Sequence, residues 1–178
     1  MHYLGAVRRV LSDLPIYFIV SLLIFIPGAN IAIIGYLVSL AGRAGDEAPF
    51  GKFIDRFSEG VQIIAIALMY SVLPLLIYNL YSLRYAVIFS CVLIPAFVFS
   101  IAMLGNGSKL GEILQVKNVS RAYSPGFIWN MIKASIFSLL VAAGHILIPI
   151  AGWIGILFGP LAVFITLMGE VYQDYFIQ

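Results

Sequence analysis

The chain has 178 residues, of which 62% are apolar and only 10% are charged, and its mean hydropathy is +1.06. Soluble domains are about half apolar and a quarter charged, so this composition excludes a water-soluble globule and predicts an integral membrane protein. A net charge of +2 does not indicate a nucleic-acid binder.

The apolar residues are grouped in four runs: 14–42, 61–83, 85–104 and 127–169. A helical span needs about 20 residues, so the last run predicts two helices, with a turn at Pro149 to Gly152. The first run is interrupted by a turn signal from Pro27 to Asn30. It is compatible with two spans, a re-entrant hairpin or one kinked helix.

The distribution of cations favours six spans: 7–26, 29–43, 61–81, 85–104, 127–148 and 151–169. Eight cations then lie on one side: Arg8, Arg9, Arg43, Lys52, Arg56, Lys109, Lys117 and Arg121. Arg84 alone lies on the other side. We therefore predict an all-α, multi-pass bundle in the cell membrane with both termini cytoplasmic. It forms a single domain, residues 1–178, built from three hairpins: 7–43, 61–104 and 127–169.

Short amphipathic helices are predicted on the basic side. An apolar stripe in residues 49–59 predicts one that lies in the membrane interface and ends at Gly60. The interfacial anchors of this stripe are Phe50, Phe53, Ile54 and Phe57. Residues 108–122 form a second, less regular interfacial segment. The eight cations would favour anionic lipid headgroups as partners.

Five polar or charged residues inside or at the ends of the spans are candidate functional positions. Asn30 is expected to cap the second helix, and Asn79 lies near the outer end of the third. His145 is interpreted as a structural histidine, with a proton-relay or ligand role as the alternative. Lys133 either extends toward the cytoplasmic headgroups or pairs with Glu170.

Prolines and glycines suggest kinks and close helix contacts. Pro74, Pro95 and Pro160 each fall in the middle of a predicted span, where proline bends a helix and interrupted helices line substrate sites in many transporters. Three small residues predict close contact, either within the monomer or between copies: Gly152, Gly155 and Gly159.

Catalytic constellations are absent from the sequence. It has two histidines, one cysteine and no carboxylate cluster with metal-ligand spacing, and it lacks nucleophile and phosphate-loop motifs. We therefore predict no enzymatic activity, no metal and no cofactor.

One set of residues resembles a known family: Ile26-Pro27, Asn30, Gly35-Tyr36, Arg43, Pro49, Phe57, Gly60, Tyr70, Pro74 and Gly169-Glu170-Val171-Tyr172. This pattern, which covers about residues 4–172, is similar to prokaryotic, largely archaeal, integral membrane proteins grouped as domain of unknown function 4013. The resemblance implies a compact helical bundle and no particular activity. Glu170 departs from the Gln or Arg common in that family.

Two functions remain open. The first is a non-enzymatic scaffold or accessory component that associates with lipids or a larger membrane complex. The second is a small permease or channel with proline-kinked helices. A permeation path should bring Ser71, Asn79, His145 and Thr166 together on water, whereas a scaffold should leave these groups dispersed and internally bonded.

Overall fold

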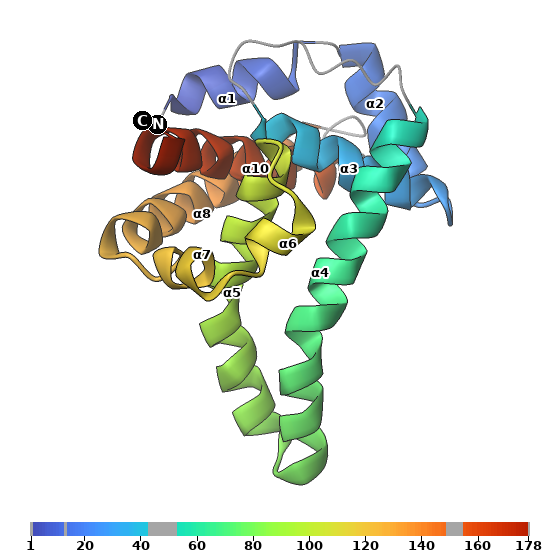
Figure 1. Cartoon of the computed structure of the whole chain (residues 1–178). Coiled ribbons are helices and arrows are strands. Elements are labelled where there is room, and N and C mark those ends of the chain that lie inside the picture. Colours follow the sequence, from blue (N-terminus) through green and yellow to red (C-terminus); the bar gives the residue numbers. More distant parts are fainter. Residues whose placement is uncertain (1, 13, 43–52, 149–154, 178) are drawn as a thin grey trace.

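The computed structural model describes residues 2–12, 14–42, 53–148 and 155–177 (Figure 1). The described chain is all-helical, with 85% helix and no strand. Its helices are α1 (Tyr3–Val10), α2 (Leu14–Leu23), α3 (Ala29–Ala41), α4 (Phe53–Leu80), α5 (Leu83–Gly105), α6 (Leu110–Ile113), α7 (Val116–Arg121), α8 (Pro125–Ile146), α10 (Phe158–Tyr172) and a π-helical turn, Gln173–Ile177. The predicted all-α class is confirmed.

Three helices in the described ranges are long and apolar enough to cross a membrane. They are Ile54–Leu80, Leu83–Gly105 and Pro125–Ile146, with mean hydropathies of 2.2, 2.6 and 1.5. Most of their apolar surface is not covered by other parts of the chain, as expected for helices that contact lipid. Six spans stay a prediction.

The predicted single span 7–26 is wrong, because the chain breaks between α1 and α2. The Ser12 hydroxyl donates to the Arg9 carbonyl at 2.8 Å, and Pro15 occupies the second position of α2, where no amide donor is needed. A further break at Gly28, whose φ is +88°, separates α2 from α3 and excludes one kinked helix. At about 1.5 Å per residue, α2 and α3 are each shorter than the bilayer core of about 30 Å.

Helix α3 is the centre of the fold and packs against α4, α5 and α10. Glycine allows its backbone to approach each neighbour closely. A Cβ atom at Gly35 would overlap the Arg56 carbonyl of α4, and one at Gly60 would overlap the Ile31 carbonyl of α3. Two glycines play the same part at the crossings with α5 and α10: Gly105 and Gly169.

The crossing of α3 with α4 also explains why the predicted helix 49–59 does not end at Gly60. Gly60 lies inside α4, which continues without interruption from Phe53 to Leu80. Here glycine serves close approach of α3 rather than helix termination. Residues 49–52, including Phe50, lie outside the described residues.

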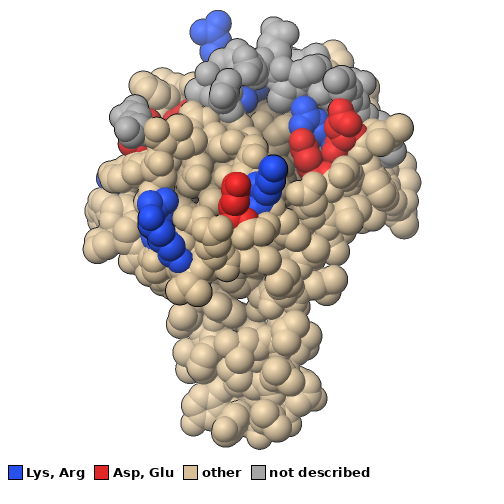
Figure 2. Space-filling model, in the orientation of Figure 1, with Lys and Arg blue, Asp and Glu red and all other residues tan. Residues whose placement is uncertain are grey.

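The α4–α5 hairpin projects from the rest of the molecule. Figure 1 shows its two helices extending beyond the other elements and meeting at a tip formed by Tyr81 and Ser82. Figure 2 shows the charged side chains over the body of the molecule, whereas the face of the hairpin drawn there carries none. The hairpin is therefore the part with the surface best suited to hydrocarbon.

The two chain ends lie together (Figure 1). The main-chain amide of His2 donates to the Glu170 carboxylate at 2.8 Å. At the C-terminal end, the Phe176 ring packs edge-on against Phe99 and lies near Phe127, with ring centroids 5.1 and 6.4 Å away. These contacts fix both termini at one end of the fold.

The last two predicted segments are helical in their described parts. Residues 108–122 contain the short helices α6 and α7, and residues 127–169 contain most of α8 and α10. The turn predicted at Pro149 to Gly152 lies outside the described residues. An interfacial position for α6 and α7 stays a prediction.

Candidate functional site

A polar contact between helices joins Tyr17 of α2 to His145 in the last turn of α8. The Tyr17 hydroxyl lies 2.6 Å from Nε2 of His145 and 3.2 Å from the Gly155 carbonyl oxygen. Tyr17 is only 4% exposed. The contact therefore ties α2, α8 and the segment that precedes α10 together across a long separation in sequence.

Both ring nitrogens of His145 have hydrogen-bond partners. Its Nδ1 atom lies 2.8 Å from the Val141 carbonyl oxygen, which can only accept, so Nδ1 carries the proton. Nε2 pairs with the Tyr17 hydroxyl, whose single proton is shared between Nε2 and the Gly155 carbonyl. In this arrangement both ring nitrogens are satisfied within the protein, as the structural interpretation of His145 requires.

The glycines near α10 make room for this pair. Cβ atoms at Gly155 and Gly159 would overlap the Tyr17 hydroxyl, and one at Gly159 would also meet Nε2 of His145 at 2.7 Å. These two glycines thus pack within the monomer, the first of the two predicted alternatives. Gly152 lies outside the described residues.

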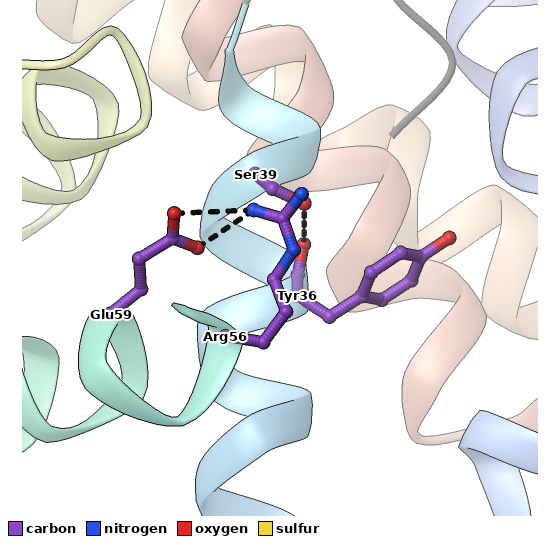
Figure 3. A network of polar contacts seen from close by, with 4 residues as sticks. All are labelled: Tyr36, Ser39, Arg56 and Glu59. Atoms are coloured by element: carbon purple, nitrogen blue, oxygen red, sulfur yellow. Dashed lines mark hydrogen bonds and ion pairs between the residues drawn. The ribbon is translucent and has the colours of Figure 1, made fainter. Parts of the chain in front are cut away.

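A second polar cluster lies where α4 crosses α3 (Figure 3). Nη1 of Arg56 donates to both Glu59 carboxylate oxygens, at 2.9 and 3.2 Å. Figure 3 shows Arg56 directed toward α3, where the Ser39 hydroxyl donates to the Tyr36 carbonyl at 2.7 Å. The Arg56 charge near the C-terminal half of α3 is favourable, because carbonyls give that end of a helix a partial negative charge.

An apolar groove runs between α4 and α5. Its volume is about 520 Å³, and it is lined by Ala67, Tyr70, Ser71, Pro74, Leu75, Tyr78, Leu83, Ala86, Val87, Ser90, Leu93, Ile94 and Phe97. Pro74 contributes to its wall, whereas Pro95 is buried. Both prolines were predicted as kink positions, but no sequence pattern indicated the groove.

The prediction that three prolines lie in the middle of long helices is correct for two of them. Pro74 and Pro95 lie inside α4 and α5. Pro160, predicted in mid-span, instead lies in the first turn of α10, where helix amides have no internal acceptor and proline costs little. The Pro160 carbonyl accepts a hydrogen bond from Ser138 of α8 at 2.6 Å, which joins the two helices.

The two asparagines act locally. The cap of α3 is Gly28 rather than Asn30, and the Asn30 side chain accepts from the Gly28 amide at 3.2 Å. The predicted capping role of Asn30 is therefore wrong in position, because the chain turns at Gly28, with its positive φ, and the helix cap lies two residues earlier. The Asn79 side chain donates to Leu75 in its own helix at 2.8 Å.

Lys133 and Glu170 make separate contacts. The Lys133 ammonium lies 5.4 Å from the centroid of the Trp129 ring, and Glu170 accepts from the His2 amide. No salt bridge between them occurs in the described structure. The pairing alternative is therefore not observed, and a cation–π contact takes its place for Lys133.

The anchor residues lie on the first turns of α4. Phe53 is the first residue of the helix, Ile54 is 82% exposed and Phe57 is 38% exposed. This exposure is compatible with contact to lipid, and the anchoring role stays a prediction.

Sequence reasoning missed the polar contacts that cap the C-terminal end of α3. The Asn106 amide donates to the Ala41 carbonyl at 3.1 Å and is itself an acceptor for Gln173 at 2.8 Å. Arg9 donates to the Gly42 carbonyl at 3.2 Å. Each partner is distant in sequence, so spacing carries no signal for these contacts.

No family model, curated protein or solved structure matches the chain. The resemblance to domain of unknown function 4013 accordingly stays a prediction, and function is argued from the geometry above.

Proposed function

We propose that the chain is a non-enzymatic integral membrane protein, a scaffold or accessory component that associates with lipids or with a larger membrane complex. One observation carries this proposal. Ser71, Asn79 and Thr166 each donate to a carbonyl of their own helix, at 2.8 Å in every case, and His145 is satisfied by Tyr17 and a carbonyl of α8. These are the four groups that a permeation path would need to present to water together.

The carbonyls near two of the prolines are also engaged. Pro95 has no amide proton, so the carbonyl four residues before it, that of Cys91, lacks its usual helical donor. The Tyr123 hydroxyl donates at 2.9 Å to the carbonyl of the next residue, Val92. Pro160 accepts from Ser138. These bonds favour a structural role for the prolines over the permease alternative, in which such carbonyls would coordinate a solute.

The proposal includes a multi-pass topology in the cell membrane with both termini cytoplasmic, and membership of the domain of unknown function 4013 family. The adjacent termini support an even number of crossings, because the His2 amide bonds to Glu170. The three long helices alone would give an odd number. In the proposed topology, the 15-residue helix α10 brings the chain back to the membrane side on which the N-terminus lies.

The topology is tested by cysteine labelling after Cys91 is replaced by Ala. We expect Ser82→Cys, at the hairpin tip, to react with a membrane-impermeant maleimide from outside the cell. Ser108→Cys, at the other end of α5, should react only after the membrane is opened. Labelling of both positions from the same side would contradict the proposed crossing by α4 and α5.

The scaffold proposal is tested by flux. Purified protein reconstituted in liposomes should leave proton, potassium and small-solute permeability equal to that of protein-free liposomes, with gramicidin as the positive control. A raised permeability that the Asn79→Leu variant lowers would establish a path and overturn the proposal. Native extraction in mild detergent should then give a particle larger than the 19.5 kDa chain accounts for.

A further inference from the structure

The apolar groove between α4 and α5 has the dimensions of a binding site. Its volume of about 520 Å³ falls within the range of about 300–1,000 Å³ found for small-molecule sites. It lies on the projecting hairpin, whose two helices are both long and apolar enough to cross a membrane. Its surroundings in a membrane are therefore hydrocarbon rather than water.

Four polar side chains line the groove, and three of them, all but Tyr78, are bonded inside the protein. The Ser71 hydroxyl donates to Leu68, and the Ser90 hydroxyl donates to Ala86, both at 2.8 Å. The Tyr70 hydroxyl lies 3.2 Å from that of Ser100. Since three of the four polar groups have partners and the rest of the lining is apolar, the groove favours an apolar occupant over a polar solute.

The groove has the length of one membrane leaflet. Its wall extends from Ala67 to Tyr78 on α4 and from Leu83 to Phe97 on α5, which correspond to about 16 Å and about 21 Å of helix. Half of the hydrocarbon core is about 15 Å, and half of the whole bilayer is about 20–22 Å. A single acyl chain from the leaflet at the hairpin tip would fit this length.

A cation marks the tip end of the groove. Arg84 is the only charged residue between Glu59 and Lys109. It is exposed and adjoins Leu83, which lines the groove. The described residues offer it no carboxylate within salt-bridge distance. An arginine at headgroup depth is a partner for a lipid phosphate.

We propose that the α4–α5 groove holds one acyl chain of an anionic phospholipid, whose phosphate pairs with Arg84. The inference rests on the proposed function, because it requires the hairpin to be inserted in the membrane. It adds a defined lipid site on the membrane side opposite to the one predicted for the eight cations. Tyr81 and Tyr85, whose ring centroids are 6.3 Å apart at the tip, match the aromatic belt expected at that interface.

The test uses phosphatidylglycerol with a photoreactive diazirine in its acyl chain, in phosphatidylcholine vesicles that contain the full chain. Val87→Trp fills the groove from its wall, whereas the neighbouring Ile88 does not line it, so Ile88→Trp is the matched control. The two parent side chains are similarly exposed, at 52% and 56%. Photolabelled peptides are identified by mass spectrometry.

We expect Val87→Trp to lower labelling of the groove peptides at least fivefold and Ile88→Trp to leave it unchanged. Arg84→Gln should retain chain labelling but abolish the preference for phosphatidylglycerol over a phosphatidylcholine probe. Equal labelling in the two tryptophan variants would show ordinary surrounding lipid and overturn the inference. Absence of lipid labelling of the groove peptides in the parent would overturn it as well.

The failure of this inference is distinguishable from failure of the proposed function. If Ser82→Cys is labelled from outside but the tryptophan variants do not differ, the hairpin is inserted and only the lipid site is wrong. If Ser82→Cys is not labelled from outside, the proposed topology itself fails.

Discussion

Replacing Gly60 by Ala tests whether direct backbone contact holds α3 against α4. The new Cβ atom would overlap the Ile31 carbonyl and lie 2.8 Å from its carbon. These backbone atoms cannot rotate away, so the helices must separate. Overpacking costs about 1–3 kcal/mol, and a clash with backbone belongs at the upper end. Alanine favours the helix over glycine by about 1 kcal/mol, so the expected net loss in the free energy of unfolding is about 2 kcal/mol.

The matched control is Gly144→Ala in α8, where a Cβ atom would meet nothing within 4 Å. This variant should be as stable as the parent or more stable by about 0.5–1 kcal/mol. Free energies of unfolding come from titration of SDS into dodecylmaltoside, followed by tryptophan fluorescence. The reasoning is refuted if Gly60→Ala matches the control. Adding Gly35→Ala to Gly60→Ala should cost less than the two single losses summed, because helices already separated accommodate both methyl groups.

Two further predictions concern tyrosines. Tyr17→Phe should cost about 1–2 kcal/mol in the same assay, because it leaves Nε2 of His145 unpaired, whereas Phe at the exposed Tyr81 should cost nothing measurable. Burial, and then the charge of Tyr70, raise the pKa of Tyr123 above its ordinary value of about 10. The stabilisation that the neutral Tyr123 side chain gives to the folded state is therefore complete below pH 10, and it is lost as the pH rises through the folded-state pKa. The decrease in melting temperature from pH 8 to pH 11 should be larger in the parent than in Tyr123→Phe. An equal decrease in the two proteins contradicts this assignment.

The elements that sequence predicted best are those with a local cause. The central hairpin follows from two apolar runs separated at Ser82, and the structure breaks there between α4 and α5. The start of α8 also has a local cause, although the predicted span began at residue 127: Pro125 begins the helix, and the Ser124 hydroxyl accepts from the Phe127 amide.

The errors arose where tertiary contacts decide the outcome. A glycine between a polar and an apolar stretch is typical of a helix end, yet Gly60 is kept inside α4 because α3 crosses there. The apolar character of residues 7–26 hides the break after Val10. The partner of His145 lies 128 residues away in the chain, so no spacing rule identifies Tyr17.

The central place of α3 has a consequence for how the protein is made. Its main partners α4, α5 and α10 all follow it in the chain, and α10 is synthesised after the other two. Until then, the backbone of α3 at Ala41, which closely faces Gly169 in the finished fold, has no neighbour from α10. A nascent chain arrested before α10 therefore exposes this surface of α3, where quality-control proteases and insertion chaperones can distinguish an incomplete molecule from a finished one.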